Sequence, residues 1–361
     1  MRTLLITLEY PPFKGGVANY YSNLAKYWPI GENITVLDNS KRDLITKKGL
    51  LPWLKSVSTI LKRRKEDDFD HLLVGHILPL GTAAIIAAFI RPFSFSLILH
   101  GLDFTSAISS VRKRFLTRMI LHRAEKIICA NSYTAELVRQ FNKKLNDKIA
   151  VVNPGIEPII PSEDCDRLKE LREQYQLEGK FVLFSLGRLV SRKGFDTVIK
   201  ALSSNESIVP NLVYFIAGSG PEEKNLRSLA AASPLKNEIF FLGGITDEEK
   251  WCWLYACDAF ILPTRTIGPD FEGFGIVYLE ANLAGRPVIA GDSGGVRDAV
   301  IDNVNGLLVQ PEDMVEIRAA IKRLADSPEL RKQLGLNGKS RAAQEFRWDK
   351  QAEEVCRLLK V

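Results

Sequence analysis

Short apolar runs alternate with amphipathic segments along most of the chain, and this alternation predicts parallel strands joined by helices. Each run is too short to be a helix, and a glycine- or proline-containing turn usually follows it. A parallel sheet that is covered on both faces has apolar strands of this kind. We therefore predict an α/β protein with strands near residues 4–8, 72–74, 95–99, 126–129, 149–152, 181–186, 212–217, 239–242, 259–262 and 287–290.

Helical spacing of apolar positions predicts helices between these strands. Residues 72–90 contain no Lys, Arg, Asp or Glu and are long enough to suggest a transmembrane helix. Gly75, Pro79 and Gly81 interrupt them, so a buried strand, a loop and a helix entered near Pro79 are favoured. The other predicted helices are 18–28, 111–123, 166–175, 195–202 and 350–359, and one that begins at Asp247 after a Thr246 cap.

The length of 361 residues exceeds what one hydrophobic core usually serves, so two domains are expected, at residues 1–160 and 161–345. A polar, proline-rich run that ends at Asp166 is the predicted linker. The five cysteines are scattered without a C-x-x-C pair, which indicates a reducing compartment and no zinc site. The apolar N-terminus is too short for a signal peptide.

Charge is distributed unevenly. Residues 1–150 contain 23 Lys and Arg against 12 Asp and Glu, a net charge of +11, whereas the remainder has 26 against 31, a net charge of −5, and the whole chain carries +6. A basic half predicts an anionic partner. No nucleic-acid motif with interleaved aromatic residues is present, so an anionic lipid surface is favoured over nucleic acid.

Residues 111–123 form the most basic of the predicted helices. Its apolar stripe either packs on its own sheet or lies on anionic headgroups, with the basic residues on the other positions. A second basic cluster, Lys62–Lys65, precedes the acidic residues 66–68, which partly neutralise it. The stripe consists of Val111, Phe115, Leu116, Met119 and Ile120, and the basic residues are Arg112, Lys113, Arg114 and Arg118.

Two glutamates flank a glycine turn in the segment Glu272-Gly-Phe-Gly-Ile-Val-Tyr-Leu-Glu280. A helix that begins near Ile276 and stops at Gly285 would place its free backbone N–H groups between the two carboxylates and form an anion site. By itself, this spacing also fits solvated glutamates around an ordinary helix start. The neighbouring strand ends favour the anion site.

The other strand ends of the second half carry groups that suit phosphate. Arg188 and Lys193 lie in one turn just before a helix start, and a guanidinium, an ammonium and a helix N-terminus all attract phosphate. Residues 218–220, 243–245 and 291–295 are glycine-rich and follow successive strands. Since parallel strands end at one edge of a sheet, such a row of loops predicts a nucleotide site.

In the first half, Gly15 and Gly16 separate the first strand from a helix start. Such a pair either holds phosphate or admits a ligand to the backbone, or it is a plain structural turn. His100 directly follows a buried strand, where open α/β sheets bind ligands. Residues 68–70 resemble a metal-binding D-x-D motif, but they precede a buried strand and are interpreted as a solvated turn. No role is assigned to the other histidines, His71, His76 and His122.

In this combination and order, the motifs resemble family-4 retaining glycosyltransferases of the GT-B fold, over nearly the whole chain. The resemblance rests on Gly15-Gly16, His100-Gly-Leu-Asp103, Gly187-Arg188 with Lys193-Gly194, Gly218-Ser-Gly220, and Glu272 with Glu280. Tyr10-Pro-Pro12, Arg265-Thr266 and residues 272–280 are similar to the bacterial phosphatidylinositol-mannoside mannosyltransferases and related polysaccharide enzymes.

This family implies two Rossmann-like domains that face each other across a cleft, with a last helix at about residues 346–361 that crosses back onto the first domain. Arg188 and Lys193 would hold the donor diphosphate. Glu280 would bind the ribose and Glu272 the donor sugar, with His100 facing the sugar from the first domain. Asp103 and Arg112 are acceptor candidates. The remaining donor-binding candidates are Gly15, Gly16, Gly187, Gly218, Ser219, Gly220, Ile245, Gly273, Phe274, Gly275, Ile276 and Val277.

The resemblance further implies a metal-independent, retaining hexosyltransferase that needs no cofactor besides its nucleotide-sugar co-substrate. GDP-mannose is the first choice of donor and a UDP-hexose the alternative, with a lipid-linked or glycan acceptor. The expected location is cytoplasmic and peripheral on the cytoplasmic face of the membrane. Competing interpretations are an epimerase or phosphorylase of the same fold and a non-catalytic nucleotide-sugar-binding protein.

Overall fold

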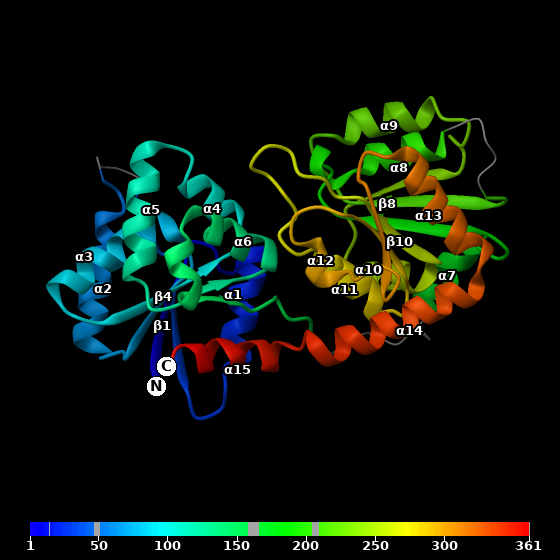
Figure 1. Ribbon diagram of the computed structural model, residues 1–361. Coiled ribbons are helices and arrows are strands. Elements are labelled where there is room, and N and C mark those ends of the chain that lie inside the picture. The colour runs from blue at the N-terminus through cyan, green and yellow to red at the C-terminus, as the bar shows by residue number, and fades with distance from the viewer. Residues whose placement is uncertain (14, 47–50, 158–165, 204–208, 361) are drawn as a thin grey trace. The chain divides into compact units, whose positions relative to one another are not determined.

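The computed structural model describes residues 1–13, 15–46, 51–157, 166–203 and 209–360. They form two compact units, Met1–Gly155 with Phe346–Val361, and Ile156–Glu345. Each unit contains one sheet of six parallel strands with helices on both faces (Figure 1). The predicted α/β class is therefore confirmed. The predicted linker falls largely on residues 158–165, which lie outside the described residues.

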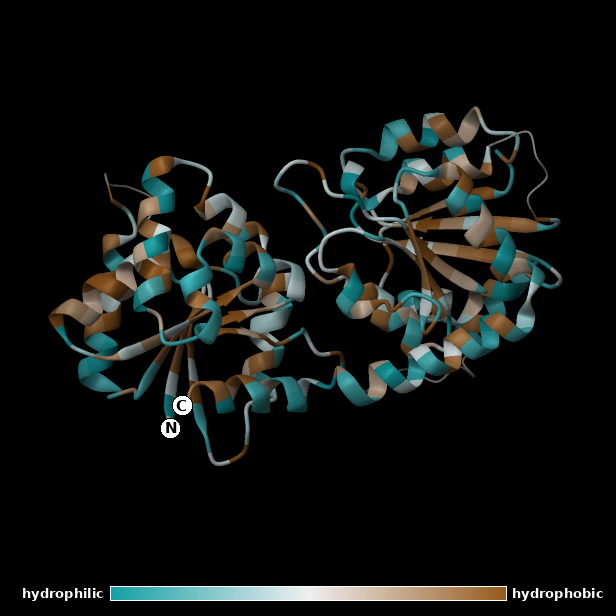
Figure 2. Cartoon of the chain, in the orientation of Figure 1, coloured by the Kyte–Doolittle hydropathy of each residue, from teal (hydrophilic) through white to brown (hydrophobic). Residues whose placement is uncertain are grey.

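The first sheet has the strand order β2-β1-β3-β4-β5-β6. Neighbouring side chains of β1 point to opposite faces, so that Leu4 and Ile6 enter one hydrophobic core and Leu5 the other. The strands appear brown in Figure 2, as expected for a sheet buried on both faces. Their bounds are β1 (Arg2–Ile6), β2 (Asn33–Leu37), β3 (His71–Val74), β4 (Ser94–Leu99), β5 (Ile127–Cys129) and β6 (Ile149–Val151).

Strand β1 ends two residues before its predicted end at Leu8. The Thr7 hydroxyl donates to the carbonyl oxygen of Glu9 at 3.0 Å and accepts from the Glu9 N–H at 3.2 Å. This local side-chain bonding replaces the strand ladder and turns the chain. The loop that begins there leads to the first glycine pair.

One face of the first sheet is covered by five helices and the other by two. The C-terminal helix is one of the pair, because Trp348 packs against Tyr20 with ring centroids 5.2 Å apart. The predicted return of the last helix to the first unit is confirmed. The five helices are α2 (Leu54–Glu66), α3 (Thr82–Ile90), α4 (Leu102–Ala107), α5 (Val111–Arg123) and α6 (Ser132–Phe141), and the pair is α1 (Gly16–Lys26) and α15 (Trp348–Leu358).

Residues 72–90 form most of strand β3, a short turn of helix, η1 (Ile77–Gly81), and helix α3. The interpretation as strand, loop and helix is thus correct. No helix among the described residues has both the length and the apolar composition needed to cross a bilayer.

The turn at residues 68–70 is also as predicted, since Asp68 and Asp70 are partly exposed and pair with Arg2 at 3.0 and 3.3 Å.

The second sheet has the strand order β12-β11-β10-β7-β8-β9, again all parallel. The order reverses between β10 and β7, and open sheets of this type bind ligands beside such a point, at the carboxyl ends of the strands. The strands are β7 (Phe181–Leu186), β8 (Leu212–Ala217), β9 (Ile239–Gly243), β10 (Ala259–Leu262), β11 (Val288–Gly291) and β12 (Gly306–Val309).

The helices of the second unit connect these strands and leave the carboxyl ends open to loops. Helix α10 begins at Asp247 with a Thr246–Glu249 capping box, as predicted. The helices are α7 (Asp166–Gln174), α8 (Phe195–Leu202), α9 (Glu223–Ala231), α10 (Asp247–Ala256), α11 (Ile276–Leu283), α12 (Val296–Ala299), α13 (Met314–Asp326) and α14 (Pro328–Glu345).

Candidate active site

Helix α11 begins where the sequence predicts, directly after Gly275. Gly275 has a left-handed φ of 81°, and a Cβ there would lie 2.4 Å from the Tyr278 ring, so both conformation and space require glycine. In the first turn, the N–H of Tyr278 donates to the Gly275 carbonyl oxygen at 2.9 Å. Those of Ile276 and Val277 have no acceptor within the helix. They form a group of donors at the carboxyl edge of the second sheet, where an anion could bind.

Glu272, just before this helix, accepts hydrogen bonds from two cations. Its Oε2 lies 2.6 Å from Lys193 Nζ and 2.7 Å from Arg192 Nη1, and Arg192 Nε lies 3.1 Å from Asp270. Burial raises the pKa of Glu272, but Lys193 and Arg192 more than offset this and hold the pKa below its ordinary value. The carboxylate is therefore ionised, and two positive side chains converge on it.

The backbone around Glu272 is held in place by the loop after β11. The N–H of Gly295 donates to the Glu272 carbonyl oxygen at 2.9 Å. Gly294 has a φ of +58°, and a Cβ there would lie 2.5 Å from the same oxygen. Glycines that the sequence suggested for a ligand thus have a packing function as well. Within the neighbouring turn, Gly273 is half-buried and Phe274 is buried.

The turn after β7 brings its cations to the same edge. Gly194 has a φ of +74°, and a Cβ there would lie 2.1 Å from the carbonyl oxygen of Pro263, so the turn packs closely on the end of β10. This packing places Lys193 against Glu272. Arg188, which follows Gly187, is exposed, and within the described ranges no carboxylate forms an ion pair with it.

The loops after β8 and β9 complete this edge. A Cβ on Gly218 would lie 1.9 Å from the Gly187 carbonyl oxygen, and one on Gly220 would lie 2.3 Å from that of Leu189. Ser219 accepts the Leu189 N–H through its carbonyl oxygen at 3.0 Å. The predicted nucleotide loops are therefore in direct backbone contact with the Arg188 turn, and Ile245 lies half-buried after β9.

Glu280 lies one turn inside α11, and a lysine from α10 binds it. Lys250 Nζ is 2.7 Å from Glu280 Oε1 and 3.2 Å from Asp247 Oδ1. Burial lowers the pKa of Lys250, but Glu280 and Asp247 more than offset this and raise the pKa above its ordinary value. The ammonium thus fixes one carboxylate oxygen of Glu280 and leaves the other oxygen to accept hydroxyl groups.

In the first unit, His100 lies at the carboxyl end of β4 among tyrosine rings. Its Nε2 is 3.0 Å from the Tyr21 hydroxyl oxygen, and that hydroxyl donates its single proton to the Gly75 carbonyl oxygen at 2.6 Å. His100 Nε2 must therefore carry the proton, and Nδ1 is an acceptor. Burial, with a smaller contribution from His76, lowers the pKa of His100 to about 3, so the ring is neutral.

His76 and Glu9 lie beside this histidine, and sequence reasoning assigned them no role. His76 Nδ1 accepts the Leu8 N–H at 3.4 Å, and its Nε2 lies 3.5 Å from Glu9 Oε1. A Cβ on Gly15 would lie 3.7 Å from the other Glu9 oxygen, whereas one on Gly16 would meet no atom within 4 Å. The glycine pair therefore borders a polar cluster, and Gly16 leaves open space at the start of α1.

The two acceptor candidates have different surroundings. Asp103 Oδ1 accepts the backbone N–H groups of His100 and Gly101 at 3.0 and 2.9 Å and so holds the histidine loop. Its Oδ2 is buried without a hydrogen-bond partner among the described atoms. Burial raises the Asp103 pKa above its ordinary value. Arg112, by contrast, is exposed on α5.

Comparison with known proteins shows what the chain as a whole is similar to. The family model described as glycosyl transferases group 1 matches residues 167–341. The GDP-mannose-dependent alpha-(1-6)-phosphatidylinositol monomannoside mannosyltransferase of Mycobacterium tuberculosis strain H37Rv is 28% identical over 99% of this chain and 98% of its own. The chain is a glycosyltransferase of the GT-B fold.

A second relative and a solved structure have the same full-length likeness. The glycosyltransferase is 27% identical to the GDP-mannose-dependent monoacylated alpha-(1-6)-phosphatidylinositol monomannoside mannosyltransferase of Corynebacterium glutamicum, over 99% of this chain and 97% of the relative. The crystal structure of Anabaena HepE in complex with UDP superposes with a TM-score of 0.81, at 20% identity, and covers 100% of both chains. The predicted glycosyltransferase class and GT-B fold are thus confirmed.

At the carboxyl edges of the two sheets, sequence reasoning missed five residues of the glycosyltransferase: Arg192 and Lys250 in the second unit, and Tyr21, His76 and Glu9 in the first. Arg192 had a readable signal, because two adjacent cations precede Gly194 in the turn after β7. Lys250 and Tyr21 had none, since each lies inside a helix and reaches its partner only through the fold.

Proposed function

We propose that this glycosyltransferase transfers mannose from GDP-mannose to a lipid-linked or glycan acceptor, with retention of anomeric configuration and without a metal ion. The observation that carries the proposal is the convergence of Lys193 and Arg192 on Glu272, beside the free amides of α11. This edge of the sheet combines groups for a diphosphate with a carboxylate for a sugar.

The charges of the reaction explain this set of residues. When a nucleoside diphosphate leaves a sugar, negative charge grows on the phosphates and positive charge on the anomeric carbon. The cations and the α11 amides stabilise the negative charge, which is the contribution that a metal ion makes in other phosphate sites. Without donor, Glu272 neutralises two of these cations. A bound diphosphate would take over part of that function and allow Glu272 to accept sugar hydroxyls.

Retention is proposed because the relatives carry alpha-(1-6) in their names and GDP-mannose is itself α-configured. A double displacement through Glu272 is not proposed, because this carboxylate is a poor nucleophile in this setting. Its Oε2 already accepts from two cations, and retaining glycoside hydrolases instead use a pair of carboxyl groups that bracket the bond. Attack of the acceptor on the same face as the leaving group, with the departing phosphate taking the acceptor proton, needs no such pair. The anomeric configuration of the product, determined by NMR, tests this; a β-mannoside from the α-configured donor would contradict retention.

The choice of base and sugar rests on the relatives. The mycobacterial and corynebacterial relatives are named as GDP-mannose-dependent mannosyltransferases and align over nearly their full length. The Anabaena structure contains UDP instead, which supports a UDP-hexose as the second candidate donor. Residues around the β9 loop, including Ile245, would contact the base.

A donor panel tests the function directly. Purified protein is incubated with GDP-mannose, GDP-fucose, UDP-glucose and UDP-galactose, each with and without extracted phosphatidylinositol mannosides, and nucleoside diphosphate release is measured in EDTA. We expect acceptor-dependent GDP release from GDP-mannose that EDTA does not reduce. Release of the nucleoside diphosphate when phosphate replaces the acceptor would indicate a phosphorylase. Isomerisation of the sugar without such release would indicate an epimerase, and tight donor binding without turnover would indicate a binding protein.

The proposed location is peripheral on the cytoplasmic face of the membrane. The basic first half and the phosphatidylinositol-linked acceptors in the relatives' names support it. In cell fractionation, the protein should sediment with membranes at low salt and be released by high salt. Complete recovery in the supernatant at low salt would contradict this location.

A further inference from the structure

Helix α5 has two apolar rows rather than the single stripe that its sequence suggested. Ile120 and Leu121 are buried in the core of the first unit, whereas Val111, Phe115 and Met119 have exposed fractions of 86%, 65% and 45%. Their spacing of four residues aligns the exposed three along one side of the helix. The two interpretations of this helix are therefore compatible: one row packs on the sheet, and the other faces outward.

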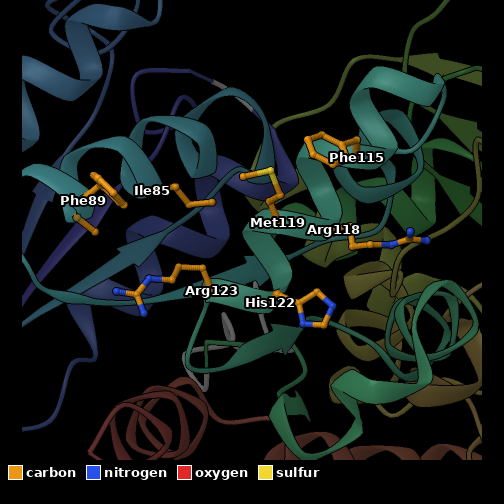
Figure 3. A pocket seen from close by; sticks show the side chains of 8 residues that line it. Ile85, Phe89, Phe115, Arg118, Met119, His122 and Arg123 are labelled. Atoms are coloured by element: carbon orange, nitrogen blue, oxygen red, sulfur yellow. The ribbon is translucent and has the colours of Figure 1, made fainter.

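The end of α3 extends this exposed row into a larger apolar surface. Phe89 and Ile90 are 93% and 59% exposed. Helices α3 and α5 pack side by side, and between them lies a groove of about 740 Å³. Figure 3 shows the rings of Phe89 and Phe115 on either side of Ile85 and Met119. The groove is lined by Ile85, Ala88, Phe89, Phe115, Arg118, Met119, His122 and Arg123.

The rim of this groove carries uncompensated positive charge. Arg118 and Arg123 line it and are exposed, and in the part of the chain that the structure describes neither forms an ion pair. Arg112 and Arg114 extend the basic surface along α5. Helix α2 provides an internal contrast, because Lys62, Arg63 and Arg64 each pair with an acidic residue four positions later. The local sequence thus neutralises one basic helix and leaves the other charged.

We propose that the surface formed by the end of α3 and the exposed row of α5 docks on an anionic phospholipid bilayer. Phe89, Ile90 and Phe115 would enter the boundary between headgroups and acyl chains, and one acyl chain would occupy the groove. Arg118 and Arg123 would contact lipid phosphates while their aliphatic stems lie on the apolar surface. Exposed apolar patches of this kind mark interaction sites, and the rim of cations selects an anionic partner.

This inference deepens the peripheral location proposed above by assigning the surface responsible, and it does not depend on the identity of the donor or acceptor. Its test is co-sedimentation with vesicles of phosphatidylcholine alone or with phosphatidylglycerol added. Transfer to a detergent-dispersed acceptor is measured in parallel. A failure of the docking surface would change the first measurement only, whereas a wrong assignment of function would appear in the second.

Three double variants separate charge, apolar contact and position. Arg118→Gln/Arg123→Gln should lower partition onto anionic vesicles about 30-fold, equivalent to about 2 kcal/mol, with no change on neutral vesicles. Phe89→Ser/Phe115→Ser should abolish the residual binding that remains at high salt. Lys62→Gln/Arg63→Gln makes the same charge change on α2 and should leave binding within about twofold. Five of the six side chains are exposed and Arg63 is half-buried at the surface, so folding, checked by circular dichroism, should be unaffected.

Two outcomes would overturn the proposal. Equal weakening by the α2 and α5 charge variants would show that only net charge matters and that this surface has no special function. Absence of vesicle binding, combined with concentration-dependent self-association that Phe89→Ser/Phe115→Ser removes, would assign the surface to a second copy of the chain instead.

Discussion

The carboxyl edges of the two sheets are built on the same scaffold but differ in chemistry. Both sheets have six parallel strands, and in both a glycine pair or glycine turn precedes a helix that begins at this edge. The second edge is ionic, with Lys193 and Arg192 on Glu272 and Lys250 on Glu280. The carboxyl edge of the first sheet consists mainly of tyrosine and histidine rings, and its neutral His100 is hydrogen-bonded to Tyr21.

This difference indicates which part of a substrate each edge can recognise. Paired cations and free amides suit a diphosphate, whose charge they neutralise. The neutral imidazole of His100, whose Nε2 is bonded to Tyr21 and whose Nδ1 is an acceptor, offers a directional hydrogen bond without net charge, which suits a sugar hydroxyl group. Substitutions in the ionic edge should therefore have the larger effects, mostly through the diphosphate. Those in the ring-rich edge should be smaller and independent of phosphate.

The largest effect is expected from Lys193→Ala. It removes a cation from the proposed diphosphate site, and loss of one preorganised electrostatic contact of this kind costs about 10²–10³-fold in kcat. We expect kcat/KM for the nucleotide sugar to fall about 10³-fold. The variant should still fold, as checked by circular dichroism, because Arg192 continues to pair with the buried Glu272 carboxylate. Lys224→Ala, an exposed lysine on α9 of the same unit, is the matched control. Full activity of Lys193→Ala would refute the assignment of this edge.

Glu272→Gln should separate turnover from nucleotide binding. The amide cannot neutralise Lys193 and Arg192, so a diphosphate would no longer compete with Glu272 for them, although Arg192 keeps its pairing with Asp270. The negative charge beside the sugar is lost. We expect kcat to fall about 100-fold, in the range of general electrostatic contributions. GDP affinity measured by calorimetry should be unchanged or tighter. An equal loss of GDP affinity would instead make Glu272 part of the nucleotide site.

The sequence allowed most of the architecture to be predicted, because most local signals agreed with the fold; strands β2 and β12 were not predicted. The start of α11 follows from Gly275 and its stop from Gly285, and strands β7, β8 and β10 match their predicted bounds. The ion pairs could not be predicted, because Lys250 and Glu280 are 30 residues apart and meet only where α10 and α11 lie on the same sheet. The neutral state of His100 likewise depends on burial, which sequence position alone does not give.

His100→Asn tests the ring-rich edge and its pH dependence. We expect kcat to fall about tenfold, because one neutral hydrogen bond to a sugar hydroxyl contributes about 1–1.5 kcal/mol. The pKa of His100, lowered by burial to about 3, lies below the ordinary value of 6.5, so the neutral ring persists as the pH falls through 6.5. The kcat/KM profile from pH 8 to pH 5 should therefore lack an acidic limb from this group. A limb near pH 6.5 that disappears in His100→Asn would contradict the neutral assignment.

The smallest effect is expected from Lys250→Met, which also tests whether the ionic edge binds the ribose and the diphosphate through separate groups. Met preserves the apolar stem but frees the Glu280 carboxylate, which Lys250 holds at 2.7 Å. If Glu280 binds the ribose, the donor KM should rise about fivefold, equivalent to about 1 kcal/mol. The kcat should stay constant, because a less well-ordered Glu280 carboxylate weakens binding of the ground state and of the transition state equally. The preference for GDP-mannose over its 2′-deoxyribose analogue should shrink in parallel, as it should in Glu280→Gln, whereas Lys224→Met changes neither. A fall in kcat with the ribose preference intact would place Lys250 and Glu280 with the diphosphate instead, and the ionic edge would then have one function rather than two.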